Sequence, residues 1–189
     1  MLVARPRPLI AAVVPDRIAW RVAAVVAGSA LIALAAQVRI PLPFSPVPVT
    51  GQTFAVLLVG AALGARLGVA SAALYMVEGL VGLPVYAGGN AGFGELAGPT
   101  GGYLVGFVVA AAVVGALAQR GWDRRFPTAV AAMLAGEVAI YAFGLLWLAR
   151  FPLPVPLLDA GLIPFVVGDA YKLVVAALAL PGAWRFVRG

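Results

Sequence analysis

The sequence predicts an all-α, polytopic membrane protein with six transmembrane helices, and three observations carry this prediction. Of the 189 residues, 63% are hydrophobic and 11% are charged, whereas soluble domains are roughly 45–50% apolar and about 25% charged. Residues 22–119 contain only four charged side chains, and about 20 apolar residues suffice to span a bilayer. The apolar runs are continuous rather than alternating, which favours helices over a β-barrel.

Six spans are expected in chain order, all within one integral membrane domain covering residues 1–189. Their predicted boundaries are about 19–38, 52–65, 67–87, 101–119, 127–149 and 161–184. The second span is unusually short. At about 1.5 Å per residue it reaches only ~21 Å, against a hydrocarbon core of ~30 Å.

A proline-rich segment precedes this short span, with prolines at positions 41, 43, 46 and 48. Each proline removes an N–H donor and disfavours helix. We therefore predict an extended outer loop that dips into the fold and makes up the missing depth. Such backbone is tolerated only where protein buries it or where it lines a cavity.

The basic residues predict that both termini lie in the cytoplasm. Ten of the thirteen then fall inside, as the positive-inside rule requires: Arg5, Arg7, Arg17, Arg21, Arg66, Arg120, Arg124, Arg125, Arg185 and Arg188. Arg39 and Arg150 are expected outside, with the proline-rich loop and the glycine-rich loop at 88–102. These irregular outer loops predict a ligand pocket that opens outward.

The residue types that are missing exclude several function classes. The chain has no Cys and no His, so disulfides, thiol chemistry, His general bases and His-based metal sites are excluded. No Gly-Lys-Ser/Thr motif marks a phosphate-binding loop, so the chain is not expected to hydrolyse ATP by itself. We expect no enzyme activity, no cofactor and no metal. The topology explains the net charge of +6 better than nucleic-acid binding does.

Four ionisable residues lie inside predicted spans, where they are costly and point to function: Glu78, Glu137, Asp169 and Lys172. Asp169 and Lys172 are three residues apart and share a helix face. They offer an acceptor and a donor to a polar ligand, or else form an internal ion pair. Glu78 and Glu137 are either proton-coupled carboxylates or protonated acids in interhelical hydrogen bonds. The structural role is preferred, because no partner base is visible.

Small residues mark two predicted helix contacts. Gly102 and Gly106 have the small-xxx-small spacing that lets helices pack closely, and Ala23 and Ala27 repeat it near the start of the first span. The glycines before Gly102 also suit a loop whose backbone approaches a ligand.

Four motifs together resemble the biotin-specific BioY family, over roughly residues 20–180. They are Pro-Phe-Ser-Pro-Val-Pro-Val-Thr-Gly-Gln-Thr-Phe (43–54), Gly-Leu-Pro-Val-Tyr-Ala-Gly-Gly (82–89), Gly-Pro-Thr-Gly-Gly-Tyr (98–103) and Gly-Asp-Ala-Tyr-Lys (168–172). The motifs occur in the family's order and spacing, which makes the resemblance far more specific than any one of them.

The resemblance implies a substrate-binding S component of an energy-coupling-factor (ECF) transporter, which captures biotin from outside a prokaryotic cell. Its expected site is the inner (plasma) membrane. Its expected partners are a transmembrane coupling subunit and two cytoplasmic ATPases, which use the ATP. The alternative is a stand-alone, proton-coupled vitamin transporter that works through Glu137 or Glu78.

The resemblance also implies roles for individual residues. Asp169 and Lys172 match the family's acid and base that contact biotin, with Asp169 accepting a ureido N–H and Lys172 donating to the ureido carbonyl. Gln52 is expected to line the pocket or to hold the proline-rich loop. Asn90 is expected to supply a further polar contact.

Three further expectations complete the predicted site. Tyr86 and Tyr103 would pack on the apolar faces of the biotin bicycle. Arg39 would pair with the valerate carboxylate or anchor the first helix at the interface. Ala23 and Ala27 resemble the Ala-xxx-Ala face by which S components dock on the coupling subunit.

Overall fold

The computed structural model describes residues 8–13, 15 and 17–188, and this part of the chain is mostly helical. Five of its helical segments are long and apolar enough to cross a membrane. They are α2 (Ile18–Gln37), α3 (Gln52–Leu80), α5 (Gly101–Ala118), α6 (Phe126–Leu148) and α8 (Ile163–Arg188), the last continuing from α7. The chain therefore has the hydrophobic spans of a multi-pass membrane protein.

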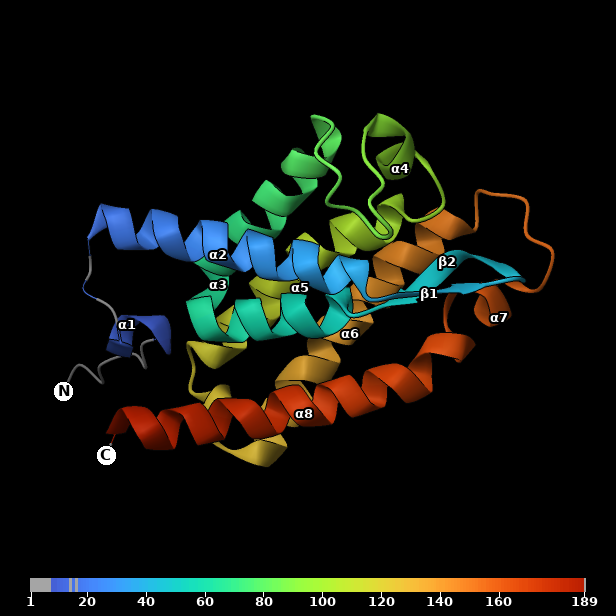
Figure 1. Ribbon diagram of the computed structural model, residues 1–189. Helices are drawn as coiled ribbons and strands as arrows, with labels where there is room; N and C mark the ends of the chain where they lie inside the picture. Colours follow the sequence, from blue (N-terminus) through green and yellow to red (C-terminus); the bar gives the residue numbers. More distant parts are fainter. Residues whose placement is uncertain (1–7, 14, 16, 189) are drawn as a thin grey trace.

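The shorter elements gather at the two ends of this helical body. They are α1 (Ile10–Val13), β1 (Arg39–Leu42), β2 (Ser45–Thr50), α4 (Phe93–Ala97), η1 (Trp122–Arg124) and α7 (Leu157–Gly161). The two strands, α4 and α7 lie at one end, whereas α1 and the C-terminal end of α8 lie at the other (Figure 1). The first of these ends is called the hairpin end below.

The α3 helix folds back on itself at Gly64. This residue has φ +79° and ψ 171°, a conformation that is essentially restricted to glycine. A Cβ placed on Gly68 would lie 2.9 Å from the Cα atom of Gly60, although eight residues of straight helix span about 12 Å. The two halves therefore meet close to the break, and they diverge from each other further along (Figure 1).

This break lies one residue before the predicted end of the second span at residue 65, but the predicted end of the third span at residue 87 is wrong. The helix ends at Leu80. Gly82 adopts φ +101° and Pro84 follows two residues later, and both features oppose helix continuation. The freed residues form a loop that contributes to the site described below. The other predicted helix boundaries lie close to the observed ones.

We expect Gly64→Ala to lower the free energy of unfolding by about 1–3 kcal/mol, since a Cβ is strained at this φ and ψ. Thermal unfolding of the detergent-purified protein measures the effect. Gly182→Ala is the matched control, because a Cβ there would meet no atom within 4 Å. Equal unfolding temperatures for the two variants would contradict the assigned role of Gly64.

The proline-rich segment is extended as predicted, but it forms two β-strands, so the all-α prediction needs correction. Strands β1 and β2 pair antiparallel, with Arg39 opposite Thr50 and Leu42 opposite Ser45. A two-stranded sheet has a free edge on each strand, where a proline costs no ladder hydrogen bond. The Ser45 hydroxyl donates to the Ala160 carbonyl at 2.6 Å, which ties the hairpin to α7.

The predicted close packing at Gly102 and Gly106 is present, between α5 and α6. A Cβ on Gly106 would lie 3.0 Å from the Cα atom of Ile140, and one on Gly102 would lie 2.2 Å from the Cβ atom of Trp147. The two backbones approach this closely because neither glycine carries a side chain. Packing of helix on helix therefore accounts for these glycines without any ligand contact.

Helix α2 divides its small residues between two faces. Gly28 faces inward, where a Cβ would lie 2.5 Å from the Ser71 hydroxyl, while Ala23 and Ala27 are exposed. The Ser29 hydroxyl donates to Glu78 Oε2 at 2.5 Å. This is the interhelical hydrogen bond that was one of the two alternatives for Glu78.

The described basic residues separate between the two ends. Cavities at the end opposite the hairpin are lined by Arg21, Arg66, Arg124, Arg125 and Arg185, all predicted to be inside. Arg5 and Arg7, also predicted inside, lie outside the described residues. The cytoplasmic placement of this end stays a prediction.

Candidate ligand-binding site

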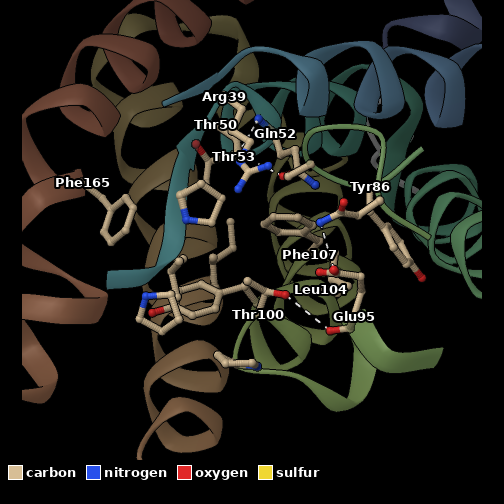
Figure 2. A pocket seen from close by; sticks show the side chains of 18 of the residues that line it. Arg39, Thr50, Gln52, Thr53, Tyr86, Glu95, Thr100, Leu104, Phe107 and Phe165 are labelled. Atoms are coloured by element: carbon tan, nitrogen blue, oxygen red, sulfur yellow. Dashed lines mark hydrogen bonds between the residues drawn. The ribbon is translucent and has the colours of Figure 1, made fainter. Parts of the chain in front are cut away.

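A cavity of about 270 Å³ lies at the hairpin end, between β2, the start of α3, the loop around α4, and helices α5, α6 and α8. Apolar and aromatic side chains form much of its wall: Pro46, Val47, Pro48, Tyr86, Pro99, Tyr103, Leu104, Phe107, Ile140 and Phe165. A few polar side chains converge on it from separate segments, Arg39, Thr50, Gln52 and Glu95 among them (Figure 2). Small-ligand sites have this composition, at volumes of roughly 300–1,000 Å³.

Asp169 and Lys172 form an ion pair beside this cavity. Lys172 Nζ lies 2.8 Å from Asp169 Oδ1. The same ammonium donates to the Thr50 carbonyl at 2.6 Å and to Thr53 Oγ1 at 3.4 Å. Lys172 lines the cavity, and its longest hydrogen bond, to Thr53, is the one that a ligand acceptor would most easily replace.

Asp169 is 5% exposed, and three side chains that line the cavity hold it. Besides Lys172, Thr53 donates to Oδ1 at 3.0 Å, and the Tyr141 hydroxyl donates to Oδ2. The carboxylate therefore stays inside the protein with both oxygens hydrogen-bonded. A buried charge needs such partners. In turn, the carboxylate fixes the position of the Lys172 ammonium, which faces the cavity.

Gln52 is buried at the start of α3, where it both lines the pocket and holds the proline-rich segment. It lines the cavity, and it connects the hairpin to the helix. Its amide donates to the Tyr75 hydroxyl at 2.7 Å and accepts from Thr50 Oγ1 at 3.0 Å. A buried amide satisfied on both sides holds one rotamer, so Gln52 fixes the end of β2 against α3.

The loop after α3 closes one side of the cavity with Tyr86 and Asn90, and α4 supplies Glu95. The Asn90 amide donates to Glu95 Oε1 at 2.9 Å, while the Tyr86 hydroxyl donates to the Met76 carbonyl at 2.6 Å. Burial, together with the charge of Glu95, raises the pKa of the Tyr86 hydroxyl above its usual value. Tyr86 therefore stays neutral at physiological pH and anchors the loop to α3.

Arg39 stands at the rim of the cavity with its guanidinium over Gly88. A Cβ on Gly88 would lie 2.3 Å from Arg39 Nη1. Within the described residues, no carboxylate forms an ion pair with Arg39. Its charge is therefore available to an anionic group at the mouth.

Two tyrosines form a rigid aromatic wall. The Tyr103 hydroxyl donates to the Gly161 carbonyl at 2.8 Å, and its ring meets that of Tyr141 edge to face, with centroids 6.4 Å apart. Since this hydroxyl is already engaged, Tyr103 presents mainly its ring to the cavity. Rings held in this way suit the apolar face of a small ring system.

Six of the seven predicted ligand-binding residues line this one cavity: Arg39, Gln52, Tyr86, Asn90, Tyr103 and Lys172. The seventh, Asp169, does not line it but bonds to three residues that do. Sequence reasoning missed Thr53, Glu95 and Tyr141. Two signals were available, because Tyr141 lies one helical turn after Glu137 and Glu95 is one of only four charged residues in 22–119.

Glu137 lies on the same helix as Tyr141 but has a different environment. It is 6% exposed, and neither carboxyl oxygen has a hydrogen-bond partner in the described part of the chain. It does not line the cavity. The interhelical hydrogen bond expected as one alternative for this residue is not seen.

Fold and site together define a multi-pass membrane protein with a cavity at one end of its helical body, whose lining suits a small ligand that is partly polar and partly apolar. A family model, that of the BioY family, matches residues 11–189. The chain belongs to the BioY family.

Similar proteins agree with this assignment. The chain is 42% identical over 151 residues to the biotin transporter BioY of Thermotoga maritima, an alignment that covers 79% of this chain and 87% of the relative. It is 38% identical to the biotin transporter BioY of Rhizobium etli, and that alignment covers 78% of this chain and 83% of the relative. These relatives are transporters rather than enzymes.

The fold also has a solved counterpart, a crystal structure of the S-component for biotin from an ECF-type ABC transporter. The two structures superpose with a TM-score of 0.77, covering 91% of this chain and 94% of the other at 24% identity. That likeness establishes the S-component fold of this chain.

Proposed function

We propose that this protein captures biotin and mediates its uptake as the membrane S component of an ECF-type transporter. Membership of the BioY family supports this function, as does identity of 42% to a biotin transporter. The observation that carries the proposal is the single cavity on which six of the seven expected residues converge.

The cavity offers a complement to each part of biotin. The Lys172 ammonium donates to the ureido carbonyl, giving up its 3.4 Å bond to Thr53. The Glu95 carboxylate, which lines the cavity, accepts from a ureido N–H group. Asp169 acts from behind the wall by holding the Lys172 ammonium in place. The aromatic wall packs on the bicycle, and Arg39 meets the valerate carboxylate at the rim.

In this proposal the chain is a single integral membrane unit of the prokaryotic plasma membrane. It crosses six times, because the two halves of α3 count as separate spans. Both termini are cytoplasmic and the cavity opens outward, an orientation supported by the basic residues at the end opposite the hairpin. The hairpin dips into the outer side of the fold, in keeping with the burial of Val47.

The partners are a transmembrane coupling subunit and two cytoplasmic ATPases. Ala23 and Ala27, both exposed on α2, form the face that docks on the coupling subunit. Only 17% of the α2 span is buried within this chain. A small-residue face that its own protein leaves uncovered suits close approach by another helix.

Titration calorimetry of biotin against the detergent-purified protein tests the ligand assignment. We expect one biotin per chain, and no heat with thiamine or riboflavin. A folded protein that gives no heat with biotin would refute the proposal.

The buried carboxyl of Glu137, which has no hydrogen-bond partner among the described residues, favours a second candidate function, stand-alone proton-coupled transport. We expect Glu137→Gln to leave biotin uptake through the ECF module unchanged, because glutamine has nearly the shape of a neutral carboxylic acid. Uptake assays in cells with and without the ATPases check this. Uptake that survives ATPase deletion, collapses with a protonophore and is lost in Glu137→Gln would favour the second candidate.

We expect Arg39→Gln to weaken biotin binding by up to about fivefold, since an exposed ion pair contributes about 1 kcal/mol or less. Binding of biotin amide, which lacks the carboxylate, should not change. Calorimetry with both ligands separates the two effects. Arg150→Gln is the control, because Arg150 stacks on Trp147 at 4.8 Å and does not line the cavity. Equal losses for biotin and its amide would contradict the role of Arg39.

A further inference from the structure

A second cavity, of about 470 Å³, lies at the end of the molecule opposite the hairpin, between the start of α6 and the last turns of α8. On α8, Arg185 comes about 20 Å further along the helix than Lys172. The second cavity is therefore separate from the proposed biotin site. No residue lines both of them.

Three arginines converge on this cavity from two parts of the chain. Arg124 and Arg125 come from the turn before α6, and Arg185 comes from α8. None of the three forms an ion pair with a carboxylate in the described part of the chain. Their charges therefore concentrate a positive potential on one small volume.

The nearest acidic residue in sequence, Asp123, does not line this cavity. It is buried and accepts from Trp184 Nε1 at 2.5 Å. Arg124 stacks on the Trp184 ring with its guanidinium carbon 4.6 Å from the centroid, and its buried Nε atom has no hydrogen-bond partner in the described structure. The Asp123–Trp184–Arg124 arrangement thus holds one guanidinium rigidly beside the cavity.

The rest of the lining is apolar and open. Phe126 and Leu178 are exposed, and a Cβ on Gly182 would meet no atom within 4 Å. A free inorganic anion would need only the arginines. An occupant that also covers the apolar side chains must carry both a negative group and a hydrocarbon part.

In the proposed orientation, this cavity lies at the cytoplasmic membrane surface, where lipids combine a negative headgroup with hydrocarbon chains. Helix α8 has 26 residues and is about 39 Å long, so its ends reach the headgroup layers. Basic pockets between helices at the cytoplasmic side suit anionic lipid headgroups. We propose that this cavity binds an anionic phospholipid, with its phosphate on the three arginines and its acyl chains along Phe126 and Leu178.

Native mass spectrometry of the full chain, titrated with phosphatidylglycerol in detergent, tests the proposal. We expect one phosphatidylglycerol to be retained per protein, and phosphatidylcholine to bind at least tenfold more weakly. The double variant Arg125→Gln/Arg185→Gln should lose retention about tenfold, while Arg125→Lys/Arg185→Lys should keep most of it. Arg124 is left intact because it packs on Trp184.

The matched control is Arg17→Gln/Arg120→Gln, which removes two exposed charges outside this cavity. Its retention should be unchanged, and biotin binding should be unchanged in all variants. Equal losses in both glutamine variants, or equal retention of the two lipids, would overturn the proposal. So would inorganic phosphate that displaces the lipid at comparable concentration. Unchanged lipid retention with impaired assembly on the coupling module would make this face a protein interface instead.

Discussion

Asp169→Asn is expected to weaken biotin binding about 10- to 100-fold without unfolding the protein. Hydrogen bonds to charged groups contribute roughly 1.5–3 kcal/mol, and about 1.4 kcal/mol corresponds to a factor of ten in affinity. The amide keeps the size of the carboxylate but removes the counter-charge that holds Lys172 Nζ at 2.8 Å. The ammonium that faces the ligand would lose its fixed position. Calorimetry with biotin measures the change.

Asp159→Asn is the matched control, because Asp159 lies on α7 and does not line the cavity. Its biotin affinity should equal that of the unmodified protein. Thermal unfolding of both variants checks that each is folded. Unchanged biotin affinity in a folded Asp169→Asn protein would contradict the assigned role of the pair.

A double-mutant cycle with Lys172→Met tests whether the two residues act as one unit. If they do, the double variant should lose little more affinity than either single variant, because each change already breaks the pair. Additive losses would mean that Asp169 and Lys172 contact the ligand independently.

Ala27→Trp is expected to abolish most coupled biotin uptake while leaving biotin binding unchanged. The residue is exposed on α2, so a large apolar side chain costs the isolated protein little. It would separate the two helices that small residues allow to approach closely. Uptake in cells that carry the ECF module should fall at least tenfold, while calorimetry of the purified variant should match the unmodified protein.

Ala131→Trp is the matched control for this prediction. Ala131 is also exposed, but it lies on α6 rather than on α2, so uptake should continue. Loss of uptake in both variants would indicate a general effect of bulk on the membrane helices. Full uptake by Ala27→Trp would refute the docking role of this face.

Much of the fold was predictable because it follows from local sequence. Long runs without charge predicted the apolar helices, and the boundaries of α2, α5 and α6 lie within about two residues of the predictions. The break at Gly64 falls one residue before the predicted end of the second span. The end of α3 was misjudged because apolar loop residues after Leu80 resemble membrane helix in composition alone, although Gly82 and Pro84 already oppose helix.

The members of the candidate site were also largely predictable, since six of the seven residues line one cavity. These residues lie in or next to short sequence motifs, which can be recognised without knowing the fold. The residues that were missed have ordinary local surroundings. Thr53 and Tyr141 matter only because folding brings them to Asp169, which is 116 residues from the first and 28 from the second.

The sequence by itself determined the membrane class, the positions of most spans, the side chains of the candidate site and the family. Each of these depends on composition or on short motifs, which a linear chain displays directly. Only the tertiary structure decided that the proline-rich segment is a β-hairpin, that Asp169 lies behind Lys172, that Glu137 has no described partner and that three arginines share a second cavity. Those features arise from contacts between distant segments, and packing geometry rather than local propensity selects them.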